Sequence, residues 1–456
     1  MSPPRFLFAE HALLPDGWAQ DVMLGWDDVG VLTEVRAGAA PEGPRAAGPV
    51  LPGMPNLHSH AFQRAFAGLT EYRSAAADSF WTWRDAMYRF ALSVSPEQLE
   101  AIATQLYVEM LRAGYTSVCE FHYLHHSPSG APYAEPAEMA LRLAAAAQRA
   151  GIGLTLLPVL YCHAGFGATP PRADQRRFIN SVDGLLRIAQ RCLEQGVRIG
   201  IAPHSLRAVA PDELTEVLNG SRAIDATAPF HLHIAEQQVE VDECIAWCGT
   251  RPVQWLLDHA PVDRHWCLVH ATHIEPSEAQ ALADRSAIVG LCPTTEANLG
   301  DGVFDATTYF DAGGRWGVGS DSHASVSVVD ELRMLEYGQR LMRQQRNVLA
   351  SRALPGIAER LWLEAAEGGA QAAAQPIGRL EAGRRADFVV LDASGVQSQL
   401  TPAQTLASAV FVQAGARPIR DVWVAGRQRV AEGVHALDAT AQAAFVAART
   451  QLLNGS

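Results

Sequence analysis

Two histidines separated by one residue, His58 and His60, are the first side chains in this chain whose types and spacing could bind a metal. Side chains on an extended segment alternate between faces, so both imidazoles would project from the same side of a strand end. Pro52 and Gly53 lie just before them and restrict how the strand approaches that position. A lone His-x-His pair is more often incidental than metallated, so the other ligands decide the matter.

Further metal-binding and acid–base side chains follow short apolar runs later in the chain. A single histidine at such a position is more often a hydrogen-bonded structural residue than a ligand, and the same holds for an aspartate in a Gly-Ser-Asp turn. Their recurrence after several runs indicates a shared site. These candidates are His204, His233, Glu236, His270 and Asp321.

The runs that precede these side chains predict a parallel sheet, because segments with helical spacing separate them. Eight such runs with interposed helices fit an α/β fold, a (β/α)8 TIM barrel, which typically needs about 250 residues. In such a barrel the carboxyl ends of the strands meet at one rim, where catalytic residues lie. The runs lie near residues 55–58 and at 117–121, 154–160, 197–202, 230–234, 266–269, 287–291 and 315–319.

The helices between the runs carry clear end signals. Pro96–Ala113 has Ser95 as its cap, Gln98 to complete a capping box and Gly114 as its terminator. Apolar residues recur along it with helical spacing. The same order of helix and then glycine is predicted at 136–150 before Gly151 and at 181–195 before Gly196.

Short alternating segments at both chain ends predict an accessory sheet. They lie at 5–9 and 21–33, and again at 387–391 and 421–427. Pairing between the two ends would give one sheet built from both. We therefore predict an accessory domain from residues 1–51 and 376–440, a barrel at 52–375 and a C-terminal helix or tail at 441–456.

The composition excludes several classes of partner and of chemistry. There are 49 acidic and 36 basic residues, giving a formal charge of -13, which argues against nucleic acid or an anionic membrane as the main partner. All the basic residues are Arg. Without Lys there is no Schiff base, no pyridoxal-phosphate attachment, no phosphate loop lysine and no lysine carbamate between two metals.

The cysteines and the terminus predict a cytoplasmic protein. The seven cysteines are an odd number without paired C-x-x-C spacing, which is typical of reduced thiols. Cys292 follows an apolar run, and we interpret it as a buried thiol. We find no signal peptide at the N-terminus and no run approaching the roughly 20 apolar residues of a membrane span.

Together, the motifs Pro55-Asn56-Leu57-His58-Ser59-His60, His233-Ile234-Ala235-Glu236, Val269-His270-Ala271 and Gly319-Ser320-Asp321-Ser322 resemble those of the amidohydrolase superfamily, in its mononuclear zinc deaminase branch. The resemblance covers nearly the whole chain. It implies that the accessory strands form a composite β-sandwich. It also implies one zinc ion per chain, held by His58, His60, His233 and Asp321, in agreement with the absence of Lys.

A finer resemblance is to the formiminoglutamate deiminases of histidine degradation. It rests on the segments 58–65, 78–84, 120–126, 202–207 and 231–237. It implies zinc-dependent hydrolysis of N-formimino-L-glutamate to N-formyl-L-glutamate and ammonia, with Glu236 as general base and then acid, and His270 and Asp321 assisting. It also implies a homodimer. The residues expected around the substrate are Gln63, Arg84, Tyr123, His204 and Arg207.

Two other functions stay open at this point. A deaminase of a guanine-like or triazine ring would use the same zinc, Glu236 and His270, with aromatic stacking in place of two arginines. A non-catalytic barrel could serve as a scaffold, although a scaffold needs neither the ligand set nor Glu236. Taken without the resemblance, Arg84 and Arg207 would be read as solvated surface charges.

Overall fold

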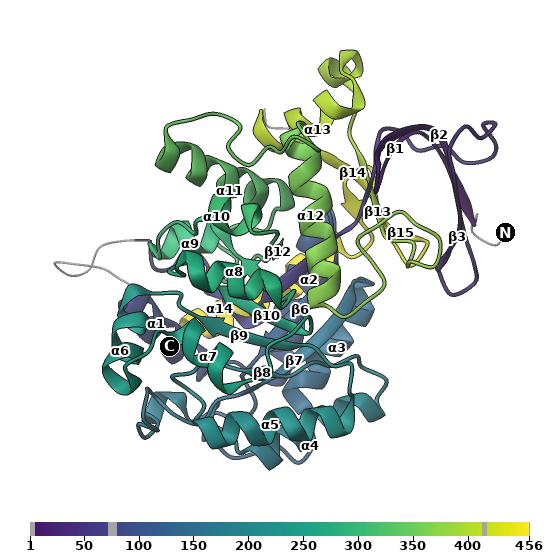
Figure 1. The fold of residues 1–456 in the computed structure, drawn as a ribbon. Coiled ribbons are helices and arrows are strands. Elements are labelled where there is room, and N and C mark those ends of the chain that lie inside the picture. The colour runs from purple at the N-terminus through teal and green to yellow at the C-terminus, as the bar shows by residue number, and fades with distance from the viewer. Residues whose placement is uncertain (1–4, 72–79, 413–416, 456) are drawn as a thin grey trace.

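The computed structural model describes residues 5–71, 80–412 and 417–455. Helices surround a central set of strands, and a separate sheet lies to one side (Figure 1). Within the described residues, two four-stranded parallel sheets form the centre, in the orders β5-β6-β7-β8 and β12-β11-β10-β9. Their bounds are β5 Met54–Ser59, β6 Tyr115–His122, β7 Gly153–Leu160, β8 Ala202–Pro203, β9 Phe230–Ile234, β10 Trp266–His270, β11 Ile288–Leu291 and β12 Arg315–Val318.

The two sheets close on each other through single parallel bridges. Ile201 pairs with Phe230 and Ser205 with His233 on one side, while Ser59 pairs with Asp321 on the other. The predicted barrel of eight parallel strands is thereby confirmed. Each predicted apolar run contributes to one strand of it.

The fourth run departs from the prediction. Residues 197–202 were expected to form a strand, but only Ala202–Pro203 does, and Ile199 joins Leu156 by an isolated bridge. Pro203 has no N–H to extend a ladder. A Cβ at Gly200 would lie 2.6 Å from the Pro229 carbonyl oxygen, so this position has no room for a side chain.

The helices around the barrel begin and end largely where the sequence predicts. In α2 the Gln98 backbone donates to Ser95 Oγ at 3.2 Å and the Ser95 backbone to Gln98 Oε1 at 2.9 Å, which is the predicted capping box. The last helix of the barrel, α12, begins at Ile357. The helices are α1 Phe80–Ala91, α2 Pro96–Arg112, α3 Glu138–Ala150, α4 Val182–Glu194, α5 Pro211–Ile224, α6 Gln238–Cys248, α7 Pro252–His259, α8 Pro276–Asp284, α9 Pro293–Leu299, α10 Ala306–Asp311, α11 Val328–Arg343 and α12 Ile357–Ala372, with α13 Pro402–Phe411 and α14 Asp438–Gly455 beyond the barrel.

The accessory sheet combines strands from both chain ends (Figure 1). Its order is β16-β15-β14-β13-β4-β1-β2-β3. The sheet curls so that Trp26 contacts Phe388 and Trp423, with ring centroids 5.9 and 5.5 Å apart, and these rings share one apolar core. The bounds are β1 Phe6–Leu14, β2 Gly17–Trp26, β3 Leu32–Arg36, β4 Val50–Pro52, β13 Phe388–Leu391, β14 Ile419–Val424, β15 Arg427–Ala431 and β16 Val434–His435.

The accessory sheet and the barrel are joined at Gly53, between β4 and β5. Its N–H donates to the Asp387 carbonyl at 3.0 Å, and a Cβ there would lie 2.4 Å from Thr116 Cγ2. The Trp362 indole donates to the Pro52 carbonyl at 2.9 Å. The first strand of the barrel is thus a direct continuation of a central strand of the accessory sheet.

Among the described residues, none of the helices has the length and apolar character needed to cross a membrane.

Candidate metal centre and substrate pocket

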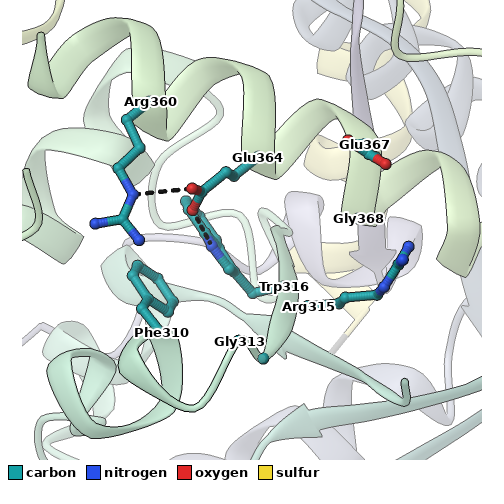
Figure 2. A pocket seen from close by; sticks show the side chains of 9 residues that line it. Phe310, Gly313, Arg315, Trp316, Arg360, Glu364, Glu367 and Gly368 are labelled. Carbon is teal, nitrogen blue, oxygen red and sulfur yellow. Dashed lines mark hydrogen bonds and ion pairs between the residues drawn. The ribbon is translucent and has the colours of Figure 1, made fainter. Parts of the chain in front are cut away.

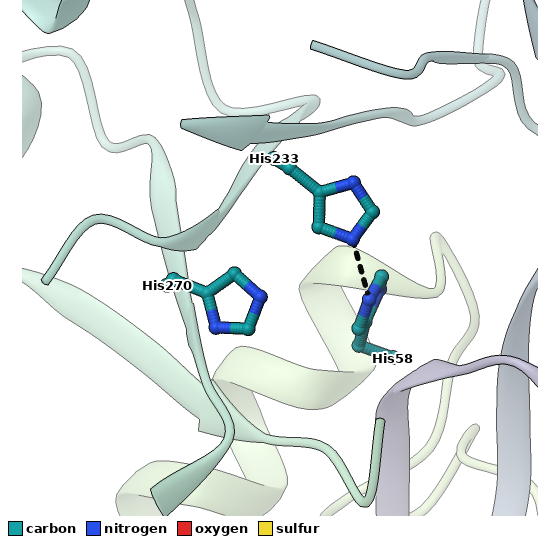
Figure 3. A group of neighbouring side chains, drawn as sticks. All are labelled: His58, His233 and His270. Atoms are coloured by element: carbon teal, nitrogen blue, oxygen red, sulfur yellow. Dashed lines mark hydrogen bonds between the residues drawn. The ribbon is translucent and has the colours of Figure 1, made fainter. Parts of the chain in front are cut away.

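The four predicted ligands converge at the carboxyl ends of three strands. His58 lies on β5 and His60 directly follows that strand, His233 lies on β9, and Asp321 follows β12. His58 Nε2 lies 3.2 Å from His60 Nε2 and 2.9 Å from His233 Nε2, as Figure 3 shows for the latter pair. Asp321 Oδ1 is 3.5 Å from His58 Nε2 and 3.3 Å from His60 Nε2. All four side chains are buried.

Hydrogen bonds turn two of the imidazoles toward this centre. The Nδ1 atoms of His60 and His233 lie 2.9 and 3.1 Å from the backbone carbonyls of Phe121 and His204. Because a carbonyl only accepts, Nδ1 carries the proton and the Nε2 lone pair points inward. Burial lowers the pKa of His60 to about 3 and that of His58 and His233 well below the usual value. Neutral imidazole is the form that binds a metal.

The spacing of these atoms fits a bound cation. Four ligand atoms placed tetrahedrally about 2.0–2.1 Å from one ion lie about 3.3 Å from each other. Four of the six distances among these atoms, the three to His58 Nε2 and the one between His60 and Asp321, are 2.9 to 3.5 Å. Lone pairs facing each other at this distance repel, whereas a cation between them binds all of them. Three histidines and one carboxylate are therefore a suitable ligand set for an ion such as zinc.

The backbone at these strand ends is strained. Ala235, His270 and Asp321 have φ values of 49°, 68° and 44°, in the left-handed region that residues with side chains rarely adopt. Such conformations persist only where the surroundings hold them, and they cluster at functional sites. Here each turns the chain at a barrel rim and aims a functional side chain inward.

Glu236 and His270 stand beside the ligand set. His270 Nε2 lies 3.6 Å from Glu236 Oε1 and 3.7 Å from Asp321 Oδ2, and Figure 3 shows its ring next to those of His58 and His233. Burial lowers the pKa of His270, but the surrounding carboxylates outweigh this effect and raise it to about 10. The imidazolium form can donate two hydrogen bonds, one from Nδ1 and one from Nε2.

One pocket contains all the residues predicted to surround a substrate. Gln63, Arg84, Tyr123, His204 and Arg207 line it together with His60, His233, Glu236, His270 and Asp321. Gln63 Nε2 donates to the Tyr123 hydroxyl at 2.9 Å. Arg84 belongs to α1, whereas Asp78 and Ser79 of the same sequence motif lie outside the described residues.

Two lining tyrosines, and a carboxylate in contact with the lining residue His270, were not among the predicted site residues. Tyr88 and Tyr161 share a hydrogen bond between hydroxyls 3.1 Å apart, and Glu296 lies 3.2 Å from His270. Tyr161 directly follows the predicted run 154–160, and a position at the carboxyl end of a barrel strand indicates a residue of the functional site. Tyr88 and Glu296 lie within helices, where spacing alone does not separate a pocket residue from a surface one.

A second pocket lies at the opposite, amino-terminal end of the strands (Figure 2). Its polar groups bond to each other: Glu364 accepts from Arg360 Nε at 2.8 Å and from Trp316 Nε1 at 3.1 Å. Phe310 stacks on Trp316. In barrel enzymes this end serves stability and the other serves chemistry, so the functional site is the pocket around the histidines.

Comparison with known proteins agrees with this geometry. The model of the Amidohydrolase family matches residues 50–429, and that described as "Formimidoylglutamate deiminase HutF, N-terminal domain" matches residues 4–45. A "Formimidoylglutamate deiminase" of Pseudomonas aeruginosa is 53% identical over 98% of this chain and 99% of that protein. A "5-methylthioadenosine/S-adenosylhomocysteine deaminase" of Natronomonas pharaonis is 28% identical over 86% of this chain and 84% of that protein.

Solved structures give the same result. The crystal structure of an amidohydrolase from Brucella melitensis is 48% identical, with a TM-score of 0.92 over 99% of this chain and 100% of that one. A zinc-bound adenosine deaminase from Xanthomonas campestris, 22% identical with a TM-score of 0.78 over 98% of this chain and 100% of that one, shares the fold. The chain therefore belongs to the amidohydrolase family, in its formimidoylglutamate deiminase branch.

Proposed function

We propose that this protein hydrolyses N-formimino-L-glutamate to N-formyl-L-glutamate and ammonia, a step of histidine degradation. The observation that carries the proposal is the shared pocket, in which Arg84 and Arg207 lie with Glu236 and with three of the four metal ligands, His60, His233 and Asp321. The Pseudomonas relative, which bears the name of this activity, supports it across the full length of both chains. The substrate carries two carboxylates, and two arginines suit them.

We further propose that His58, His60, His233 and Asp321 hold one zinc ion per chain. When bound there, the ion would lower the pKa of a water from that of bulk water to about 7, which makes a nucleophile available at neutral pH. The neutral histidines and the converging Nε2 atoms support this assignment.

Glu236 would move the proton. As a general base it takes a proton from the attacking water, and as a general acid it passes that proton to the departing nitrogen, which leaves as ammonia. The imidazolium of His270, whose Nε2 lies 3.6 Å from Glu236, would stabilise charge that builds up beside the attacked carbon. Asp321 would accept a hydrogen bond from the water and so orient it.

Arg84 and Arg207 would bind the two substrate carboxylates. A guanidinium presents a planar fork of donors that matches a carboxylate oxygen pair. Tyr123, Gln63 and His204 line the same space and would donate further hydrogen bonds. Both arginines lie in the pocket, which favours a dicarboxylate over the stacked aromatic ring of the alternative ring deaminase.

Ammonia release tests the proposal. Protein of measured metal content would be incubated with formiminoglutamate, with formiminoaspartate and with guanine in parallel. We expect rapid release from formiminoglutamate at one zinc per chain. Turnover of guanine without turnover of formiminoglutamate would overturn the substrate assignment and favour a ring deaminase. No turnover of any of the three by zinc-loaded protein would favour the scaffold hypothesis.

The assembly and location of the protein stay predictions. We propose a cytoplasmic homodimer that engages neither nucleic acid nor membranes; the formal charge of -13 supports the absence of nucleic acid and anionic membranes as partners. Sedimentation equilibrium would measure the mass in solution. A single species at the monomer mass of 49.1 kDa would contradict the dimer.

A further inference from the structure

The side chain that holds His270 in place has no role in the proposed function. His270 Nδ1 lies 3.2 Å from Glu296 Oε1, and both residues are buried, with 1% and 5% of their surface exposed. An ionised carboxylate can only accept a hydrogen bond. The proton between these two atoms therefore belongs to Nδ1 of His270.

Glu296 is itself fixed by the backbone around it. It lies in the first turn of α9, and its N–H donates to the Cys292 carbonyl at 2.9 Å. The N–H of Cys292 donates at 2.8 Å to the same Oε1 that contacts His270. The N–H of Asp301 donates to the Glu296 carbonyl at 2.9 Å. The carboxylate is thus anchored at the end of β11 and reaches across to the end of β10.

This anchor determines where the other ring nitrogen points. With Nδ1 held by Glu296, Nε2 of His270 faces Glu236 Oε1 at 3.6 Å and Asp321 Oδ2 at 3.7 Å. The described contacts of the His270 ring nitrogens include no other carboxylates. A ring without the Glu296 contact could turn about its side-chain bonds and take Nε2 away from the reacting group.

We infer that Glu296 is a positioning residue, which fixes the ring orientation of His270 by accepting a hydrogen bond from Nδ1, so that Nε2 faces the reacting group. Partners of this kind, which orient a functional histidine, typically contribute about 10–100-fold to activity when removed. The inference deepens the proposed function and rests on it for its kinetic test.

Two substitutions separate positioning from simple stability. In Glu296→Gln the amide oxygen can replace Oε1 and accept from both His270 and Cys292, whereas Glu296→Ala removes the acceptor. We expect Glu296→Ala to lower kcat by about 10–100-fold, with KM and zinc content nearly unchanged, and Glu296→Gln to retain most of the rate. Glu331→Ala is the matched control. Glu331, on α11, is a fully buried carboxylate that binds Thr294 of α9, the helix that carries Glu296.

A second readout does not depend on turnover. Long-range proton–nitrogen NMR spectra, assigned with a His270→Asn variant, would show a hydrogen-bonded Nδ1–H signal of His270 in the parent and in Glu296→Gln but not in Glu296→Ala. The inference is overturned if the ring signals are unchanged in Glu296→Ala, or if its kcat falls no further than that of Glu331→Ala. If the parent fails to release ammonia from formiminoglutamate, the proposed function fails while the ring signals still test the positioning.

Discussion

At the scale of single residues, the site contains one acidic side chain placed to move a proton beside the ligand set. Glu236 is buried, with 5% of its surface exposed, and follows β9 by two residues. The left-handed turn at Ala235 directs it toward His270. Neither the ligand set nor the arginines can replace a group that both accepts and returns a proton.

Glu236→Gln should remove this proton transfer and leave the metal centre intact. The amide has nearly the same shape but no basic oxygen, and Glu236 is not one of the four ligands. General acid–base groups contribute about 10²–10⁴-fold to the rate. We therefore expect kcat to fall by at least about 10²-fold, with metal content unchanged. Metal analysis and ammonia release measure both quantities, and an active Glu236→Gln protein would contradict the mechanism.

Arg207→Ala should weaken binding of a dicarboxylate more than it slows the chemical step. Arg207 lines the pocket, with 7% of its surface exposed, and a charged hydrogen bond contributes about 1.5–3 kcal/mol. We expect KM for formiminoglutamate to rise by about 10–100-fold, with a smaller change in kcat. Arg346→Ala, at an exposed position, is the control. Equal rises in KM for both variants would remove Arg207 from the binding site.

How far the sequence could be interpreted depends on how local each signal is. His58 ends β5 with His60 just beyond it, and the runs that carry His233 and precede Asp321 are strands in the structure, so barrel geometry alone brings these residues together. Glu296 could not be identified in this way, because its contact with His270 depends on how α9 packs between two strand ends. The shortness of β8 was likewise not apparent from the run 197–202, of which the structure pairs only single residues before Ala202.

At the scale of elements, α1 is the helix that brings Arg84, Met87 and Tyr88 to the pocket. Its last carbonyl, that of Ala91, accepts from Arg177 Nη1 at 2.6 Å, and the Val94 carbonyl accepts from the same atom at 2.8 Å. Arg177 is fully buried, and its Nε also donates to the His126 carbonyl at 2.6 Å. A single guanidinium therefore fastens the end of α1 to the loop after β6.

Arg177→Met should loosen α1 and so move Arg84 and Tyr88. The substitution keeps most of the apolar volume but leaves three buried carbonyls without their donor, at about 1–3 kcal/mol each. We expect the free energy of unfolding to fall by at least about 3 kcal/mol and KM for formiminoglutamate to rise. Denaturant titration and steady-state kinetics would measure the two effects. A loss of stability with KM unchanged would show that the clamp does not position the pocket.

At the scale of the whole molecule, the strand that carries His58 and leads directly to His60 is continuous with the accessory sheet. β4 pairs with β13 on one side and with β1 on the other, and β5 begins two residues after β4 ends. The joint at Gly53 has no room for a side chain next to Thr116. Displacement of this joint would therefore reach His58 and His60 through the backbone.

Gly53→Ala tests this connection. The added Cβ would lie 2.4 to 2.9 Å from side-chain atoms of Thr116, so residue 53 and β6, which carries Thr116, must move apart. We expect a loss of about 1–3 kcal/mol in the free energy of unfolding together with lower zinc occupancy. Thr116→Ala removes two of the three clashing atoms, and the double variant should recover part of both losses. Full zinc occupancy in Gly53→Ala would indicate that the joint does not govern the metal site.

The position of β4 also sets the order in which this protein can be assembled during its synthesis. Residues 50–52 leave the ribosome early, yet their partner β13, at 388–391, follows only after the entire barrel sequence has been made. Until then one edge of β4 is open to pairing with other chains. Contacts so distant in sequence also slow folding. The accessory sheet can therefore close around β4 only after the last part of the chain is made. A truncated product would expose the edge of β4 that the complete protein covers.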